Sequence, residues 1–305
     1  MTRSAPATPT PTPSKAAPRS TARRRIHWRD IGANWLAFTI IFLLALPALW
    51  IILTAFRPNL EVNASPPIWI PRELTLEAFE SLFGLNPETA SGVPVMDYLR
   101  NSILVALLAT ALSVPIGTAA GYAFSRFSFV GSRMLLLLLL LTRAVPGVAL
   151  SLPLFLLMKN IGFIDTVHGL AFIYMALNIP FTAWLMDGFF RRIPRELDDA
   201  AYVDGASHWQ TFWKIDLPLA LPGLGAASVF AFLAAWNEYQ IASIMTKTPV
   251  AKTFPVGLSD FTTQFTVDWR GMAAMSVLMM VPAIIFVLLM QRSLTKGLTF
   301  GAVKG

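Results

Sequence analysis

The chain has 305 residues, of which 55% are hydrophobic and only 13% are charged. A soluble globular protein carries about 25% charged residues, so this composition excludes an ordinary soluble domain and indicates a polytopic membrane protein. Cysteine is absent, which excludes disulfides and thiolate metal sites, and the three histidines do not form an HExxH zinc motif.

The N-terminal segment, residues 1–30, is rich in Pro, Thr and Ala and becomes basic at "TARRR". Such a segment buries too little apolar surface to fold, so we expect a disordered basic tail. The apolar run after it is too long for the core of a cleaved secretory signal. We therefore expect this run to stay as a signal anchor, and residues 31–305 to form one transmembrane domain.

The rest of the chain contains six apolar segments, each long enough to cross a hydrocarbon core of about 30 Å. They are predicted at about 34–56, 101–124, 134–158, 169–190, 221–245 and 272–290. With the first tail inside, sixteen of the 24 Lys and Arg residues fall on the cytoplasmic side and seven outside. This asymmetry predicts an all-α, multi-pass protein with both termini in the cytoplasm. It also accounts for the net charge of +7 without a nucleic-acid partner.

The longest outer loop, residues 57–98, contains the stretch "SPPIWIPRELTLEAF". Pro67 and Pro71 exclude a regular helix there, and Trp69 suits an anchor at the membrane interface. Two interpretations stay open for this loop: it caps the helices, or it contacts an extracytoplasmic partner.

Several polar residues lie inside the apolar segments. Charged and amide side chains are costly there, and they usually face the bundle interior or a water-filled cavity. Arginine, amide, carboxylate and aromatic groups together are suited to binding a polyol, and they indicate a solute path. The alternative is that they serve only as contacts between helices. The candidates are Arg143, Tyr174, Asn178, Asn237 and Glu238.

Between the fourth and fifth apolar segments, residues 187–218 carry ten charged side chains. Inserting them would cost about 25–35 kcal/mol, so this segment must lie in water. Pro194 and the acids after it favour a helix start, and Gly205 permits a bend. Ser207 can cap a second helix. The pattern predicts a helical hairpin that exposes Ala200 and Ala201 as small positions for close approach.

The stretch "DAAYVDGASHWQTFWKIDLP" resembles the EAA signature of ABC-importer permeases, EAA-x3-G-x9-I-x-LP, within a loop at 191–218. The one departure is an aspartate in place of the usual glutamate. The C-terminal "QRSLTKGLTFGAVKG" (291–305), "NS" at 101–102 and "AWNEY" at 235–239 resemble the maltose-transporter-like, carbohydrate-uptake class. The resemblance covers residues 30–305. The matching signature residues are Asp199, Ala200, Ala201, Gly205, Ile215, Leu217 and Pro218.

The resemblance implies a six-helix permease subunit of the bacterial inner membrane that imports a sugar, oligosaccharide or polyol. Its EAA loop would dock onto a cytoplasmic ATPase, with the C-terminal tail (291–305) also reaching that partner. The implied assembly has two ATP-binding-cassette subunits, a second permease subunit in a heterodimer, and an extracytoplasmic solute-binding protein. Because the sequence has no GxxxxGK[ST] loop, we expect ATP and Mg²⁺ to be used by the partner ATPase. We expect this chain to bind no cofactor and not to be an enzyme.

Two other classes of function fit the sequence less well than the importer. A secondary transporter or channel working alone would need ion-coupling groups near the membrane midplane. Six spans without detectable internal repeats are also few for such a transporter. A membrane enzyme would need clustered catalytic carboxylates. The one such cluster, Asp198, Asp199 and Asp204, lies within and beside the EAA signature and is explained by it.

Overall fold

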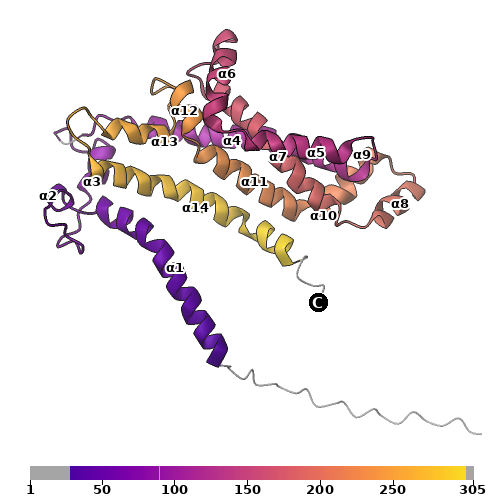
Figure 1. Cartoon of the computed structure of the whole chain (residues 1–305), viewed down its shortest axis with the longest axis horizontal. Helices are drawn as coiled ribbons and strands as arrows, with labels where there is room; N and C mark the ends of the chain where they lie inside the picture. Colours follow the sequence, from indigo (N-terminus) through magenta and orange to yellow (C-terminus); the bar gives the residue numbers. More distant parts are fainter. Residues whose placement is uncertain (1–27, 89, 300–305) are drawn as a thin grey trace, which may run out of the picture. The chain divides into compact units, whose positions relative to one another are not determined.

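The computed structural model describes residues 28–88 and 90–299 (Figure 1). These residues form helices, turns and one isolated bridge between Thr262 and Val267, with no strand among them. The all-α prediction is therefore confirmed. The predicted tail at 1–30 lies outside the described residues except for 28–30, which begin α1. Of the predicted C-terminal tail at 291–305, residues 291–299 continue the last helix, and 300–305 lie outside the described residues.

The chain divides into two compact units, residues 1–47 and residues 48–305, with the boundary inside α1 (Trp28–Ala55). Among the described residues, the first unit holds only the beginning of α1, and the second holds the end of α1 and every later element. The later elements are α2 (Asn59–Val62), α3 (Glu77–Leu82), α4 (Val95–Arg126), α5 (Ser132–Leu141), a 3-10 turn (Thr142–Ala144), α6 (Gly147–Asn160), α7 (Val167–Phe190), α8 (Arg195–Val203), α9 (His208–Thr211), a π-helix (Phe212–Asp216), α10 (Leu217–Leu219), α11 (Leu221–Trp236), α12 (Gln240–Met245), α13 (Phe254–Gly257), a 3-10 turn (Leu258–Phe261) and α14 (Trp269–Thr299).

Four described segments are long and apolar enough to cross a membrane as single helices: Asn34–Ala55, α4, α7 and Trp269–Gln291. Two bent pairs also qualify. Ser132–Ala144 and Gly147–Asn160 meet at 94°, and His208–Leu219 and Leu221–Trp236 meet at 75°. By length and composition the described residues therefore contain four spans, or six if each bent pair is one span.

The third and fifth apolar segments were expected to be continuous helices, and the structure shows both to be broken. In the third, Val145 is extended because the residue before Pro146 is pushed out of the helical region. In the fifth, α11 ends at Trp236, and the Glu238 side chain accepts hydrogen bonds from the N–H groups of Ile241 and Ala242. These two hydrogen bonds satisfy N–H groups in the first turn of α12, which have no partner within the helix, so a new helix starts after the break.

Helices α4 and α7 pack closely along their lengths, with α11 against both and α14 against α11. Two glycines one turn apart, Gly117 and Gly121, permit this approach. An added Cβ would lie 2.5 Å from Cβ of Thr182 at the first position and 2.7 Å from the Ala183 carbonyl oxygen at the second. Small residues at such a spacing let membrane helices pack backbone to backbone.

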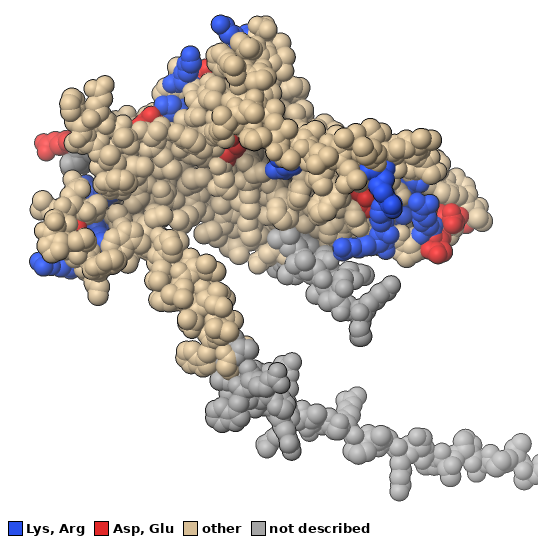
Figure 2. Space-filling view, viewed as in Figure 1, with Lys and Arg blue, Asp and Glu red and all other residues tan. Residues whose placement is uncertain are grey.

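Charged side chains gather over the hairpin helices at one end of the second unit, on the face drawn in Figure 2. Helices α8 to α10 lie at this end, and α3 and α13 lie at the other (Figure 1). At the α13 end, Asn101 Nδ2 donates to the carbonyl oxygens of Pro249 and Lys252, and Ser102 Oγ accepts from the N–H of Phe254. The "NS" pair thus fastens the loop before α13 to α4.

Candidate functional site

The predicted hairpin is present, and its corner has a defined geometry. Gly205 follows α8 with φ +83°, in the left-handed region. The N–H of Ala206 donates to Ala201 O, and the N–H of Gly205 to Tyr202 O, which together close a Schellman motif. Ser207 and Gln210 then form a capping box that starts α9. The local sequence therefore sets the angle between the two helices.

The second helix of the hairpin widens into a π-turn at Phe212–Asp216 before α10. Pro218 has no N–H group to donate to the preceding turn, and the wider π-turn accommodates this missing hydrogen bond. Ile215 lies within the π-turn and is half-buried, while Leu217 begins α10. The "I-x-LP" part of the signature thus marks a change in helix geometry just before α11.

Exposure separates the signature residues into two groups. Asp199, Ala200 and Gly205 are exposed. Ala201 is 7% exposed, which corrects the expectation that both alanines face outward. Helical spacing turns Ala201 toward the inside of the hairpin, where its carbonyl closes the Gly205 corner. Beside the exposed group, Trp209 and Trp213 are 68% and 51% exposed.

A buried ion cluster, which the sequence analysis did not predict, holds the hairpin to α4. Arg126, the last residue of α4, places Nε 2.9 Å from Asp198 Oδ2 and NH2 2.6 Å from Asp216 Oδ1. All three side chains are 6% exposed or less. In the sequence, Asp198 belongs to the acidic cluster beside the signature, and Arg126 is one of the sixteen basic residues that fall on the cytoplasmic side. The signal that could have indicated the cluster is the charge of Asp216 between the apolar Ile215 and Leu217.

Two more arginines reach the same end of α4. Arg191 donates to Phe124 O at 3.1 Å and also pairs with Asp187 at 2.8 Å, and Arg195 donates to Ser125 O at 3.0 Å. Carbonyls at a helix C-terminus have no partner within the helix and carry partial negative charge. The hairpin is therefore docked on α4 by several independent charged contacts.

Arg143 lines a cavity of about 500 Å³ together with Phe181, Phe230 and Leu233. Its guanidinium carbon lies 5.4 Å from the Phe181 ring centroid, and the side chain is exposed at the break between the 3-10 turn and α6. Of the five predicted path residues, all of which the structure describes, Arg143 is the one that lines this cavity.

The other candidate path residues are placed differently. Tyr174 is 2% exposed and donates a hydrogen bond to Glu238, which also caps α12. Asn178 is 4% exposed and donates to Ala231 O at 3.1 Å. Tyr174, Asn178 and Glu238 thus make contacts between helices. Asn237 is exposed beyond the end of α11.

The two broken segments meet. Helices α6 and α12 pack on each other, and an added Cβ at Gly147 would lie 3.2 Å from Gln240 Oε1. Non-helical backbone at membrane depth persists where it is covered by protein or lines a water-filled cavity. The cavity beside Arg143 lies at the first of these breaks.

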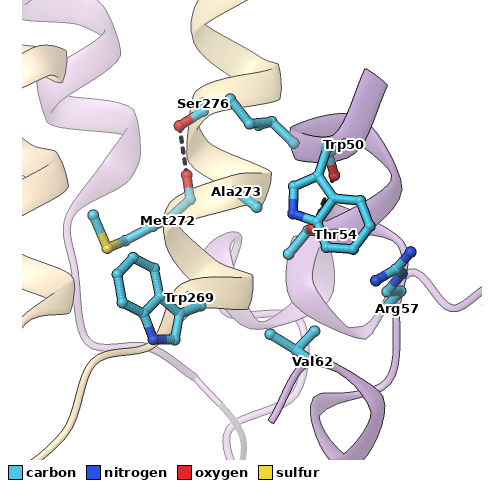
Figure 3. Close-up of a pocket in the computed structure, with 9 residues that line it drawn as sticks. Trp50, Thr54, Arg57, Val62, Trp269, Met272, Ala273 and Ser276 are labelled. Carbon is cyan, nitrogen blue, oxygen red and sulfur yellow. Dashed lines mark hydrogen bonds between the residues drawn. The ribbon is translucent and has the colours of Figure 1, made fainter. Parts of the chain in front are cut away.

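A second cavity, of about 510 Å³, lies between the last turns of α1 and the start of α14 (Figure 3). Trp50 and Trp269 line it, and Arg57 lies at its edge with its guanidinium 4.5 Å from the Trp50 ring centroid. Arg57 also donates to Ile68 O and Trp69 O, which holds the Pro-rich loop against α1. The described residues between α2 and α3 form no regular helix, as the two prolines of this loop predict.

A family model described as "Binding-protein-dependent transport system inner membrane component" matches residues 113–300, which include the hairpin and both breaks. The chain belongs to this family. It is a permease subunit of an ABC importer, and the resemblance noted in the signature is confirmed.

Two relatives match this permease over nearly their whole lengths. The trehalose transport system permease protein SugB of Mycobacterium tuberculosis is 35% identical, over 93% of this chain and 99% of its own. The diacetylchitobiose uptake system permease protein DasC of Streptomyces coelicolor is 31% identical, over 91% and 97%. A chain from the crystal structure of a bacterial alginate importer has the same fold, with a TM-score of 0.69 at 21% identity over 87% and 96%.

Proposed function

We propose that this permease subunit imports a sugar, oligosaccharide or polyol handed over by an extracytoplasmic binding protein. The support is the transport named for its relatives, trehalose and diacetylchitobiose, over almost the whole chain. Arginine donors beside aromatic faces are also the groups that recognise hydroxyls and sugar rings. On this proposal the Arg143 cavity contributes to the solute path, together with the exposed Asn237 at the second break.

The hairpin couples transport to ATP hydrolysis in this proposal. The observation that carries it is the corner at Gly205, which presents four exposed residues at one end of the second unit: Asp199, Ala200, Trp209 and Trp213. Exposed apolar side chains beside a charged residue are typical of a surface that a partner covers. The partner is a cytoplasmic ATPase, and we assign the binding of ATP and Mg²⁺ to that partner.

The assembly follows from the same proposal. Two ATPase subunits bind on the cytoplasmic side of a pair of permease subunits. This chain is one member of that pair, which is a heterodimer. Both termini and the hairpin face the cytoplasm, and the loops near α3 and α13 face the binding protein. The excess of Lys and Arg on the hairpin side supports this orientation.

The coupling role is tested by charge reversal and by strain at the corner. Asp199→Lys reverses an exposed charge, and Gly205→Val places a β-branched residue at φ +83°. We expect both variants to insert and assemble, yet to lose ATP hydrolysis stimulated by the binding protein, together with uptake, by about ten- to a hundredfold, as expected for a loss of about 1–3 kcal/mol at a packed contact.

The matched control is Glu88→Lys, a reversal of an exposed acid in the outer loop. It should leave stimulated hydrolysis unchanged. The measurement is ATPase activity of each purified complex with saturating binding protein and solute. Stimulation at the wild-type level in both hairpin variants would show that the hairpin is a passive connector.

A further inference from the structure

The buried cluster at the base of the hairpin contains two carboxylates and one guanidinium. Asp198 comes from α8, Asp216 from the π-helix and Arg126 from the end of α4. Three elements that are separate in sequence are therefore joined by one cationic side chain. Arg126 also donates to Ile193 O at 3.3 Å, so its planar fork reaches three groups at once.

Each of the two carboxylates has one oxygen that no donor reaches. Asp198 Oδ1 and Asp216 Oδ2 are buried and accept no hydrogen bond from any described residue, and Arg126 Nε is ion-paired with Asp198 but makes no hydrogen bond. A buried acceptor without a donor is unfavourable, and two carboxylates that share one site favour holding a proton between them. A proton on Asp198 would supply the missing donor and leave one negative charge opposite Arg126.

The surroundings agree with a shared proton. Burial, then the negative charge of Asp216, raises the pKa of Asp198, and Arg126 opposes this only in part. The other groups that face the cluster are Tyr122 from α4 and Tyr202 and Asp199 from α8. The Tyr202 hydroxyl lies 2.7 Å from Nδ1 of exposed His208, so the cluster adjoins a residue that reaches solvent.

We propose that Arg126, Asp198 and Asp216 form a proton-sharing clamp that fixes the hairpin to α4 and transmits hairpin movement to the membrane helices. The clamp deepens the proposed coupling function and rests on it. Helix α4 suits this role because its other end is fastened by Asn101 and Ser102 to the loop before α13. A displacement of the hairpin is thereby carried to the opposite end of the second unit by a single helix of 32 residues.

The clamp is tested on the whole importer complex by hydrogen exchange of residues 195–216 and by the ratio of stimulated to basal ATP hydrolysis. Arg126→Met leaves two buried carboxylates without a cation. We expect the hairpin amides to exchange about tenfold faster and the hydrolysis ratio to fall about tenfold, with Arg126→Lys intermediate because a single ammonium cannot reach all three groups. The control Arg133→Met, at an exposed arginine, should change neither.

Asp198→Asn tests the shared proton. It also tests the clamp if the Arg126→Met variant does not assemble into a complex. Because the pKa of Asp198 is raised, its protonated form favours the docked hairpin, and this contribution is lost as pH rises through the raised pKa. In the wild type, the hairpin amides should therefore exchange faster as pH rises. This increase should be larger than the one in an exposed peptide of the same complex, which reports the pH dependence of exchange itself. The Asn variant should not show this additional increase.

Three results would overturn the clamp: wild-type hairpin exchange in Arg126→Met, faster exchange with an unchanged hydrolysis ratio, or the same pH dependence in Asp198→Asn as in the wild type. Failure of the coupling proposal is recognised separately. In that case Asp199→Lys and Gly205→Val keep full stimulation, whatever the exchange of the hairpin amides shows.

Discussion

The hairpin end of the permease and its broken spans are built in opposite ways. At the hairpin end, charged side chains from α4, α8 and the π-helix meet in a buried cluster. The rings of Tyr122 and Phe212 pack there with their centroids 4.7 Å apart. At the breaks, the backbone leaves the helical conformation at Pro146 and Asn237, and Arg143 lines an open cavity. The hairpin end is held by many contacts, whereas the broken spans leave polar groups accessible.

On the proposed function, the two regions have different tasks. A rigid attachment is needed where movement of a partner is passed to the membrane helices, since transitions of this kind move packed elements as bodies. A path for a polar solute needs accessible polar groups, and helix breaks provide them in membrane proteins. The contact between α4 and α7 connects the two regions, because α7 ends at the hairpin and carries Phe181 to the cavity.

The largest effect is expected where the α4–α7 contact is broken. In Gly121→Val the new side chain would begin 2.7 Å from the Ala183 carbonyl oxygen and 2.8 Å from the Asp187 nitrogen. Backbone atoms cannot rotate away, so we expect a loss of about 3 kcal/mol and little assembled complex. Gly188→Ala in α7 is the control, since an added Cβ there meets nothing within 4 Å. The melting temperatures of the two purified complexes check this, and equal values would contradict it.

A smaller effect is expected at the cavity. Arg143→Ala should reduce uptake about tenfold, which corresponds to about 1.4 kcal/mol, while complex assembly stays intact. Because the chain has no cysteine, single cysteines can report on access to water. A cysteine at 143 should react with a small polar thiol reagent in at least one nucleotide state, whereas one at the buried Asn178 should not. Full uptake by Arg143→Ala together with an unreactive cysteine at 143 would remove this residue from the path.

The smallest effect is expected at Asp165, which joins the loop before α7 to the loop after α12. Its carboxylate accepts from the N–H groups of Lys247 and Thr248 and from the Thr248 hydroxyl. Burial alone would raise the pKa of Asp165, but these hydrogen bonds outweigh it and leave the pKa below its usual value.

The sign of the pH effect at Asp165 follows from this direction. The stabilisation is present above the usual aspartate pKa and is lost as pH falls through the lowered one. Asp165→Asn keeps a residue that tolerates φ 57° but removes the charge, so it should cost about 1 kcal/mol at neutral pH and show no such acid-dependent loss. Melting temperatures across an acid series would check this, and a parallel decline in both proteins would contradict it.

Much of the hairpin was predictable because its signals are local. Pro194, Gly205 and Ser207 act on the backbone within one or two turns, so a helix start, a corner and a cap could be predicted from their order. The apolar segments were predictable for the same reason, since length and hydropathy decide whether a helix can cross a membrane. The break at Pro146 had a local signal as well. It was not predicted because proline is often tolerated within membrane helices, as at Pro115 in α4.

The sequence alone determined the all-α membrane fold, the EAA hairpin and the family, since these depend on composition, on periodicity and on spacing along the chain. Tertiary packing was needed to show that Ala201 faces inward, that Tyr174 and Asn178 are buried contacts, and that Arg126 joins Asp198 to Asp216. The reason is physical. Arg126 lies 90 residues from Asp216 in the chain, and which polar group meets which depends on the close α4–α7 packing that brings their ends together.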